Sequence, residues 1–284
     1  MSTRHLAALL LALAAGRAAR SQAPAAPAAA DTAPPIEDNS FLVEEAYNQP
    51  RGVVQHIGTF ARFNGGAGWV ATFTQEWPLG GQRHQLSYTA AEVHPDAART
   101  APHIGDLALN YRFQARDRGG VLVAPRITVV LPTGSARLGA GAGGVGLQAN
   151  LPVTHELSPR WSIHSNVGGT VVPRGHDEDG GRVSSTNLTL AQSVIWLARP
   201  TFNVLVEGLW SHTATVPAGS GSAEHETLAV VSPGVRYAVN LASGMQIVPG
   251  VAVPFTVGGN ARRSPVDVGV FAYFSVEHAF AHTH

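Results

Sequence analysis

Apolar and polar side chains alternate along the chain, most regularly in residues 265–280. One face carries Val266, Val268, Val270, Ala272, Phe274, Val276 and Phe280, and the other carries Asp267, Gly269, Tyr273, Ser275 and Glu277. A period of two predicts a β-strand. Soluble strands usually have about five or six residues. The greater length here fits a tilted strand with lipid on one face and a polar interior on the other.

The same alternation recurs from residue 52 onwards, and no helical period follows residue 50. We predict strands at 52–63, 68–78, 82–91, 104–115, 120–132, 144–153, 160–172, 185–198, 201–213, 226–238, 244–256 and 265–280. The total of about twelve is even, as single-chain bacterial barrels require.

The predicted connections alternate in length. Short ones cover 79–81, 115–119, 154–159, 198–200 and 239–243, and long ones cover 91–103, 133–143, 173–183, 213–225 and 257–264. The first connection, 64–67, is an exception because it is short where a long loop is expected. Transmembrane barrels have short periplasmic turns and longer outer loops. The pattern therefore predicts an N-terminus in the periplasm.

Aromatic residues fall near the predicted strand ends. They are Trp69, Trp77, Trp161, Trp196 and Trp210. Such placement is typical of interfacial girdles, and the alternative is the aromatic core of a soluble β-sandwich. The last predicted strand stops at Phe280, which resembles the C-terminal assembly signal of bacterial outer-membrane barrels, although residues 281–284 follow it.

The first 23 residues are typical of a secretory signal peptide. A short basic start at Arg4 and His5 precedes an apolar stretch at 6–15, and 21–23 offer a cleavage site. The alternative is a retained amphipathic anchor. Residues 24–35 are rich in Ala and Pro, which predicts a linker. The chain has no cysteine, which excludes a lipoprotein anchor and disulfides.

Residues 36–51 precede the barrel and form a segment of their own. Asp38 and Asn39 are helix N-cap types, and they precede an apolar cluster that begins at Phe41 and is interrupted by Glu44 and Glu45. The pattern predicts a short helix, and such a helix needs tertiary packing. It would enter the lumen as a plug or cap its periplasmic mouth; an ordered lead-in to the first strand is the equal alternative.

All 19 basic residues are arginine, and the whole chain also has 19 acidic residues. Without Arg4, Arg17 and Arg20 the mature chain carries 16 − 19 = −3. This balance gives no electrostatic case for binding nucleic acid. The low share of charged residues, 13%, suits a barrel whose outer wall is apolar.

Alternation places eight charged residues in the lumen. They are Glu76, Arg83, Asp106, Arg112, Arg126, Glu207, Arg236 and Asp267. A charge on the lipid face would cost about 2–4 kcal/mol near the midplane, so energetics also favours the inward direction. Two interpretations are open: a polar pathway with a balanced constriction, or ion pairs that brace a plugged lumen.

The sequence offers little catalytic or metal-binding chemistry. The run His164-Ser165-Asn166 is similar to the His-x-Ser-Asn run of outer-membrane phospholipase A, but adjacent strand residues point apart. His and acidic residues at 155–156 and 176–179, and His278, His282 and His284, lack a known ligand spacing. Gly139–Gly144 does not lie between a strand and a helix, so it predicts a loop. We expect no enzyme activity, no metal and no cofactor.

Several stretches resemble one bacterial family. They are 36–49, 52–56, 73–78, 84–88, 104–112, 124–126 and 131–134. Together they resemble the outer-membrane family named for the meta-pathway of phenol degradation, whose members are often called transporters. The resemblance runs over most of residues 36–280. It implies an outer-membrane β-barrel with a transport role and suggests aromatic substrates.

The sequence thus predicts an all-β protein: an antiparallel transmembrane barrel of about twelve strands over 52–280, with an N-terminal periplasmic or plug segment. The expected function is passive passage of small solutes, with aromatic or apolar compounds as candidates, across a bacterial outer membrane. The alternatives are a structural or adhesive barrel with a plugged lumen and an outer-membrane hydrolase. Expected partners are outer-membrane lipid, lipopolysaccharide, the outer-membrane assembly machinery and the solute.

Overall fold

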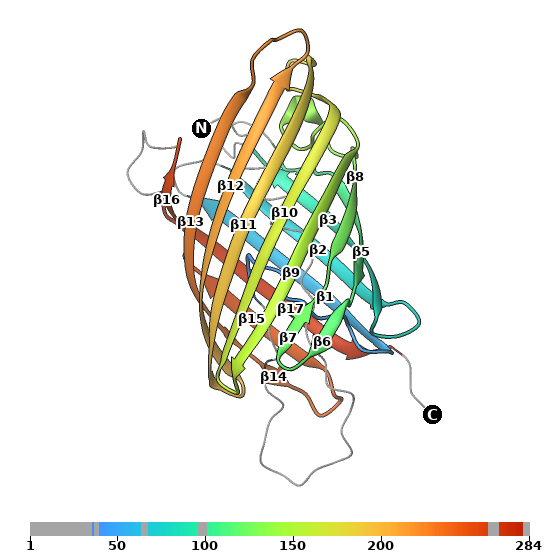
Figure 1. Ribbon diagram of the computed structural model, residues 1–284, viewed down its shortest axis with the longest axis vertical. Coiled ribbons are helices and arrows are strands. Elements are labelled where there is room, and N and C mark those ends of the chain that lie inside the picture. Colours follow the sequence, from blue (N-terminus) through green and yellow to red (C-terminus); the bar gives the residue numbers. More distant parts are fainter. Residues whose placement is uncertain (1–35, 37–39, 64–67, 96–100, 261–266, 281–284) are drawn as a thin grey trace.

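The described residues of the computed structural model form a closed antiparallel barrel of twelve strands (Figure 1). The structure describes residues 36, 40–63, 68–95, 101–260 and 267–280. The predicted signal peptide and linker, 1–35, lie outside this part of the chain. Each strand of the wall pairs with its neighbour in sequence, and the last pairs with the first. Closure leaves no free strand edge.

Four strands of the wall are divided or extended by short pieces, so twelve strands comprise seventeen labelled elements. The wall runs through β1 (Val53–Phe63), β2 (Trp69–Pro78), β3 (His84–His94), β4 with β5 (His103–Ile104, Leu107–Phe113), β7 with β8 (Val121–Val123, Arg126–Leu131), β9 (Gly146–Ser158), β10 (Trp161–His176), β11 (Arg182–Arg199), β12 (Phe202–Pro217), β13 (Glu224–Tyr237), β15 with β16 (Gln246–Ala252, Phe255–Gly259) and β17 (Gly269–Ala279). Additional pieces are β6 (Arg116–Arg118), β14 (Val239–Asn240) and the 3-10 turn η1 (Ala136–Leu138). No helix among the described residues is long and apolar enough to cross a membrane.

The twelve predicted strands are confirmed, but several of them, including β9 to β13, extend beyond the predicted limits. β10 reaches His176 and β12 reaches Pro217, within the predicted loops 173–183 and 213–225. In these extensions polar residues such as Ser185 and Thr215 pair across the strands, which breaks the apolar period. β10 to β13 therefore rise above the rest of the rim at one end of the barrel (Figure 1). We call this the long-loop end, and the opposite end the short-turn end.

The wall is apolar outside and polar inside. Along β17, Phe271, Tyr273 and Ser275 are buried, whereas Val270 and Phe274 are exposed, so the predicted alternation holds. Large apolar side chains that face outwards include Leu109, Ile127, Leu147, Val167, Leu188, Val206 and Val251. Trp161 and Trp196 are 44% and 42% exposed, so the soluble sandwich with an aromatic core is wrong.

Phe280 completes the seam between the first and last strands. Its backbone N–H donates to the Gly52 carbonyl at 2.8 Å, and Val53 lies opposite Ala279. Phe280 is 56% exposed. The assembly role of its ring stays a prediction.

We expect Phe280→Ala to lower the amount of folded protein in the outer membrane, because it removes the terminal aromatic ring. Phe274→Ala is the matched control, since Phe274 lies on the same strand and is similarly exposed, at 50%. Folded protein is measured by gel mobility of unheated samples. Equal yields for the two variants would remove the assembly role of Phe280.

Candidate functional site

Residues 40–49 lie inside the barrel, and we call them the luminal segment. All ten are buried, and their partners come from strands around the ring, including β3, β5, β9, β10, β12 and β17. Ile36 precedes the luminal segment. Its N–H donates to the Pro200 carbonyl at 2.7 Å, which places Ile36 at the short-turn end. The segment then enters β1 through residues 50–52.

Glu207 of β12 holds the first part of the luminal segment. Its carboxylate accepts hydrogen bonds from the backbone N–H groups of Phe41 and Leu42, each at 2.9 Å, and of Val43, at 3.2 Å. The Ser40 hydroxyl also donates to it. Successive N–H groups that point to one side form an anion-binding concavity, and hydrogen bonds to a charged acceptor are among the stronger ones.

The rest of the luminal segment is held in the same way by neutral side chains of the wall. Backbone N–H groups donate to Asn166 at 2.8 Å, Thr154 at 2.9 Å, Gln114 at 3.0 Å and Gln85 at 2.6 Å. The described part of 36–51 contains no helix, unlike the prediction, because the wall takes the N–H groups that a helix would pair internally. Of the predicted plug residues, Asp38 and Asn39 lie outside the described residues.

Two wall arginines neutralise and clamp the segment. The Arg126 guanidinium lies 2.6 Å from the Glu44 carboxylate. Burial raises the pKa of Glu44, and the guanidiniums of Arg126 and Arg112 oppose that rise. Arg112 donates to the Asn48 side chain at 2.8 Å and to the Glu45 carbonyl at 3.4 Å. Arg126 therefore holds the segment through a carboxylate, and Arg112 holds it through an amide side chain and a backbone carbonyl.

Phe41 is one of the apolar contacts of the segment with the wall, beside Tyr47, which packs with Leu122 and Ala124. The Phe41 ring lies 5.8 Å from that of Phe271 and 5.3 Å from that of Tyr273, centre to centre. Gly234 and Gly250 form the floor of this seat, because a β-carbon at either position would overlap the ring. The alternation showed inward residues here, but it gave no sign that glycines make room for a ring from residue 41.

The other predicted lumen residues lie in different places. Glu76 is buried and lies 3.8 Å from Arg112. Arg236 is buried on β13, and Asp267 is half-buried just before β17. Arg83 departs from the prediction, because it is exposed in the turn before β3 with its guanidinium 5.1 Å from the Phe113 ring centre. Alternation does not extend to a turn.

Asp106 acts at the long-loop end rather than beside the luminal segment. Its carboxylate accepts the backbone N–H groups of Gly134, at 2.9 Å, and Ala142, at 2.7 Å. These bonds fold the glycine-rich connection between β8 and β9 across part of the barrel mouth. The predicted loop is confirmed here, and its anchor is an inward carboxylate.

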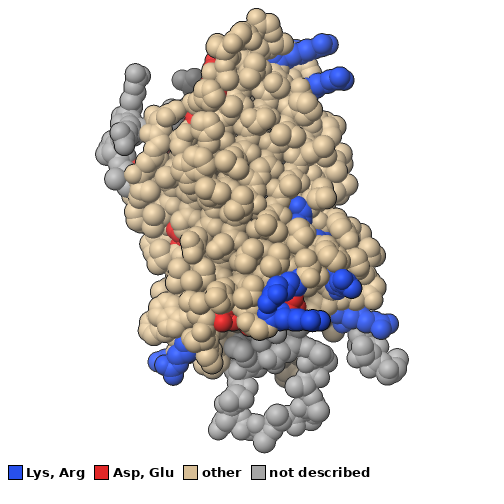
Figure 2. Space-filling view, in the orientation of Figure 1, with Lys and Arg blue, Asp and Glu red and all other residues tan. Residues whose placement is uncertain are grey.

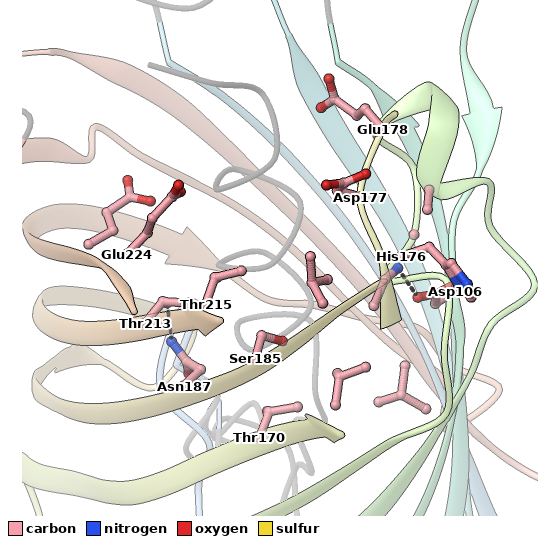
Figure 3. A pocket seen from close by; sticks show the side chains of 18 of the residues that line it. Asp106, Thr170, His176, Asp177, Glu178, Ser185, Asn187, Thr213, Thr215 and Glu224 are labelled. Carbon is pink, nitrogen blue, oxygen red and sulfur yellow. Dashed lines mark hydrogen bonds between the residues drawn. The ribbon is translucent and has the colours of Figure 1, made fainter. Parts of the chain in front are cut away.

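A cavity of about 350 Å³, which we call the vestibule, opens at the long-loop end (Figure 3). Asp177 and Glu178 lie on one side and Glu224 on the other, with hydroxyl and amide groups of β10 to β12 between them. These groups include Thr170, Ser185, Asn187, Thr213 and Thr215, and Val130, Val172 and Val183 add apolar surface. The vestibule is therefore both polar and apolar.

A second, much smaller space adjoins the luminal segment. It has about 20 Å³ and lies between Leu42 of the luminal segment, Arg126 and the wall residues Asn166 and Gly168. A buried water needs about 10–15 Å³ of such volume. The space therefore holds little more than one water molecule, and the luminal segment lines it.

The described residues give the hydrolase alternative no support. His164 is buried and pairs with the Thr154 hydroxyl at 2.7 Å, while Ser165 alternates to the outward face. Among the described residues, no three His, Asp or Glu side chains lie close enough together to hold a metal ion.

Comparisons with known proteins reveal similarity in fold. No protein-family model matches the sequence, and no curated protein matches it. Among solved structures, the COG4313 outer membrane channel from Pseudomonas putida F1 has a TM-score of 0.61 at 10% identity, covering 82% of this chain and 98% of the channel. The NanC porin has a TM-score of 0.50 at 10% identity, covering 78% and 98% respectively. The chain therefore has the fold of outer-membrane channel barrels.

We expect Glu207→Gln to loosen the start of the luminal segment, because a neutral amide replaces a carboxylate that accepts three N–H groups. A hydrogen bond to a charged group contributes about 1.5–3 kcal/mol, so hydrogen exchange at Phe41 to Val43 should accelerate at least about tenfold. Asp106→Asn is the control, since its N–H partners lie at the other end. Unchanged exchange at Phe41 to Val43 would show that Glu207 does not hold the segment.

Proposed function

We propose that the protein is an outer-membrane channel that passes small solutes passively, with the luminal segment as its plug. The observation that carries this proposal is a polar lumen that is occupied, at one level, by a segment of the chain itself. The segment is not part of the wall, so it can move without breaking the barrel. The vestibule above it then leads to a pathway that the plug closes.

The outward face supports a membrane location. Leu109, Ile127 and Val206 are 45%, 62% and 48% exposed, and each belongs to a different strand of the same apolar belt. Burial of apolar surface is worth about 25 cal/mol per Å², which makes such a belt unfavourable in water. A bilayer removes that cost, and the closed wall satisfies every strand edge within it.

The vestibule favours small solutes that combine an apolar part with a polar group and carry no negative charge, since Asp177, Glu178 and Glu224 also line it. Val130, Val172 and Val183 can contact the apolar part, while Thr213 and Asn187 offer hydrogen bonds. Aromatic compounds that carry a hydroxyl group fit this description. The resemblance of residues 36–280 to the phenol-degradation family points to the same class, although no family model supports it.

The second candidate function is a structural or adhesive barrel that stays closed. The density of contacts favours it, because Glu207, Arg112 and Arg126 all hold the luminal segment. In this case the ion pairs brace the wall and the long-loop end meets partners. Ion flow separates the two functions.

Deletion of 24–49 should raise single-channel conductance in planar bilayers, because it removes the luminal segment and leaves the wall intact. Deletion of 24–34 is the matched control, since it keeps the described part of the segment. A folded 24–49 deletion that conducts no better than the full chain would contradict the plug and favour the braced barrel.

The loop asymmetry predicts that the long-loop end faces outwards and the short-turn end faces the periplasm. Epitope tags after Gly180 or Gly219 should be reachable on intact cells, whereas tags after Gly119 or Gly244 should not. All four glycines are turn residues with positive φ, so the sites are comparable. Labelling after Gly119 and Gly244 alone would reverse the orientation.

A further inference from the structure

Exposed arginines gather around the short-turn end, and we call them the arginine collar. Its members lie at five places around the barrel, since two of them share β6: Arg51, Arg83, Arg116, Arg118, Arg160 and Arg199. Asp117 is the one exposed acid at this end among the described residues. Figure 2 shows arginine side chains around the lower part of the molecule. The exposed described charges there sum to 6 − 1 = +5.

Among the described residues, the long-loop end carries less exposed positive charge. Its described exposed arginines are Arg62, Arg137, Arg174 and Arg182, and with the exposed acids Glu92, Asp179 and Glu224 they sum to 4 − 3 = +1. In the described part of the chain, no collar arginine forms an ion pair. The guanidiniums of Arg112 and Arg126, in contrast, are buried in the lumen and contact the luminal segment. The collar therefore presents unneutralised cations to its surroundings.

The collar lies directly beside outward-facing aromatic rings. Arg160 precedes Trp161, and Arg199 follows Trp196 by three residues; the two Trp rings lie 6.3 Å apart, centre to centre. Arg83 lies over Phe113. Trp residues in membrane proteins mark the level of the lipid headgroups, and long cationic side chains extend from that level towards the headgroup charges.

We infer that the arginine collar binds the phosphate groups of anionic phospholipids in the leaflet around the short-turn end. A guanidinium matches phosphate oxygens with two parallel N–H donors. Lipid fits better than a protein partner, because the arginines are spread around the ring next to the aromatic belt rather than gathered in one patch. The inference goes beyond the proposed function and does not depend on whether the lumen conducts.

The test compares two quadruple variants with equal loss of charge. One is Arg83→Gln, Arg116→Gln, Arg160→Gln and Arg199→Gln in the collar, and the control is Arg62→Gln, Arg137→Gln, Arg174→Gln and Arg182→Gln at the long-loop end. Purified full-length proteins are titrated with phosphatidylglycerol or phosphatidylcholine in detergent, and bound lipid is counted by native mass spectrometry. Gel mobility of unheated samples confirms that each variant is folded.

The collar variant should bind phosphatidylglycerol at least about tenfold more weakly than wild type, since each arginine near a lipid surface contributes on the order of 1 kcal/mol. The control variant should stay close to wild type, and phosphatidylcholine binding should change little in either. Equal losses in the two variants, or an unchanged affinity of the collar variant for phosphatidylglycerol, would overturn the inference. So would retention of a periplasmic protein by wild type with no preference between the two lipids.

Discussion

The carboxylate of Glu207 is the interaction on which the arrangement of the lumen depends. It is buried, and an isolated buried carboxylate is costly. Three backbone N–H groups and the Ser40 hydroxyl compensate for that burial. The same bonds fix the direction of the chain at residues 41–43, and this direction brings Phe41 to its glycine seat and Glu44 to Arg126.

A barrel with a polar interior has to satisfy that interior. The apolar side chains on the outer face of the wall form no core inside the barrel. The polar side chains inside therefore need hydrogen-bond partners from water or from the protein itself. Here the luminal segment supplies many of them, because an irregular backbone offers donors and acceptors that a helix would have used internally. The absence of a helix in the described residues of this segment and the polarity of the wall therefore have one physical cause.

The sequence was sufficient for the wall and insufficient for what fills it. Alternation predicted twelve strands and the inward direction of Glu76, Arg112, Arg126, Glu207 and Arg236, because a period of two is a local property. Helix-capping residues before an apolar cluster also predicted a short helix at residues 41–47. The structure has no helix there. The partners of those residues are at least 65 positions away, and Leu42 and Glu207 are 165 apart, and no local pattern encodes such pairing. Arg83 was misplaced for a related reason, since a turn interrupts the period.

The kind of contact that holds the luminal segment bears on how it could leave. The hydrogen bonds, including those of Arg112, and the ion pair between Arg126 and Glu44 can be replaced by water once the lumen is hydrated, so their net contribution is far below their gross strength. The exceptions are the apolar contacts, those of Phe41 with Phe271 and Tyr273 and of Tyr47 with Leu122, which have no aqueous substitute. Release therefore requires the polar contacts to be exchanged for hydration while these buried apolar side chains are exposed to water.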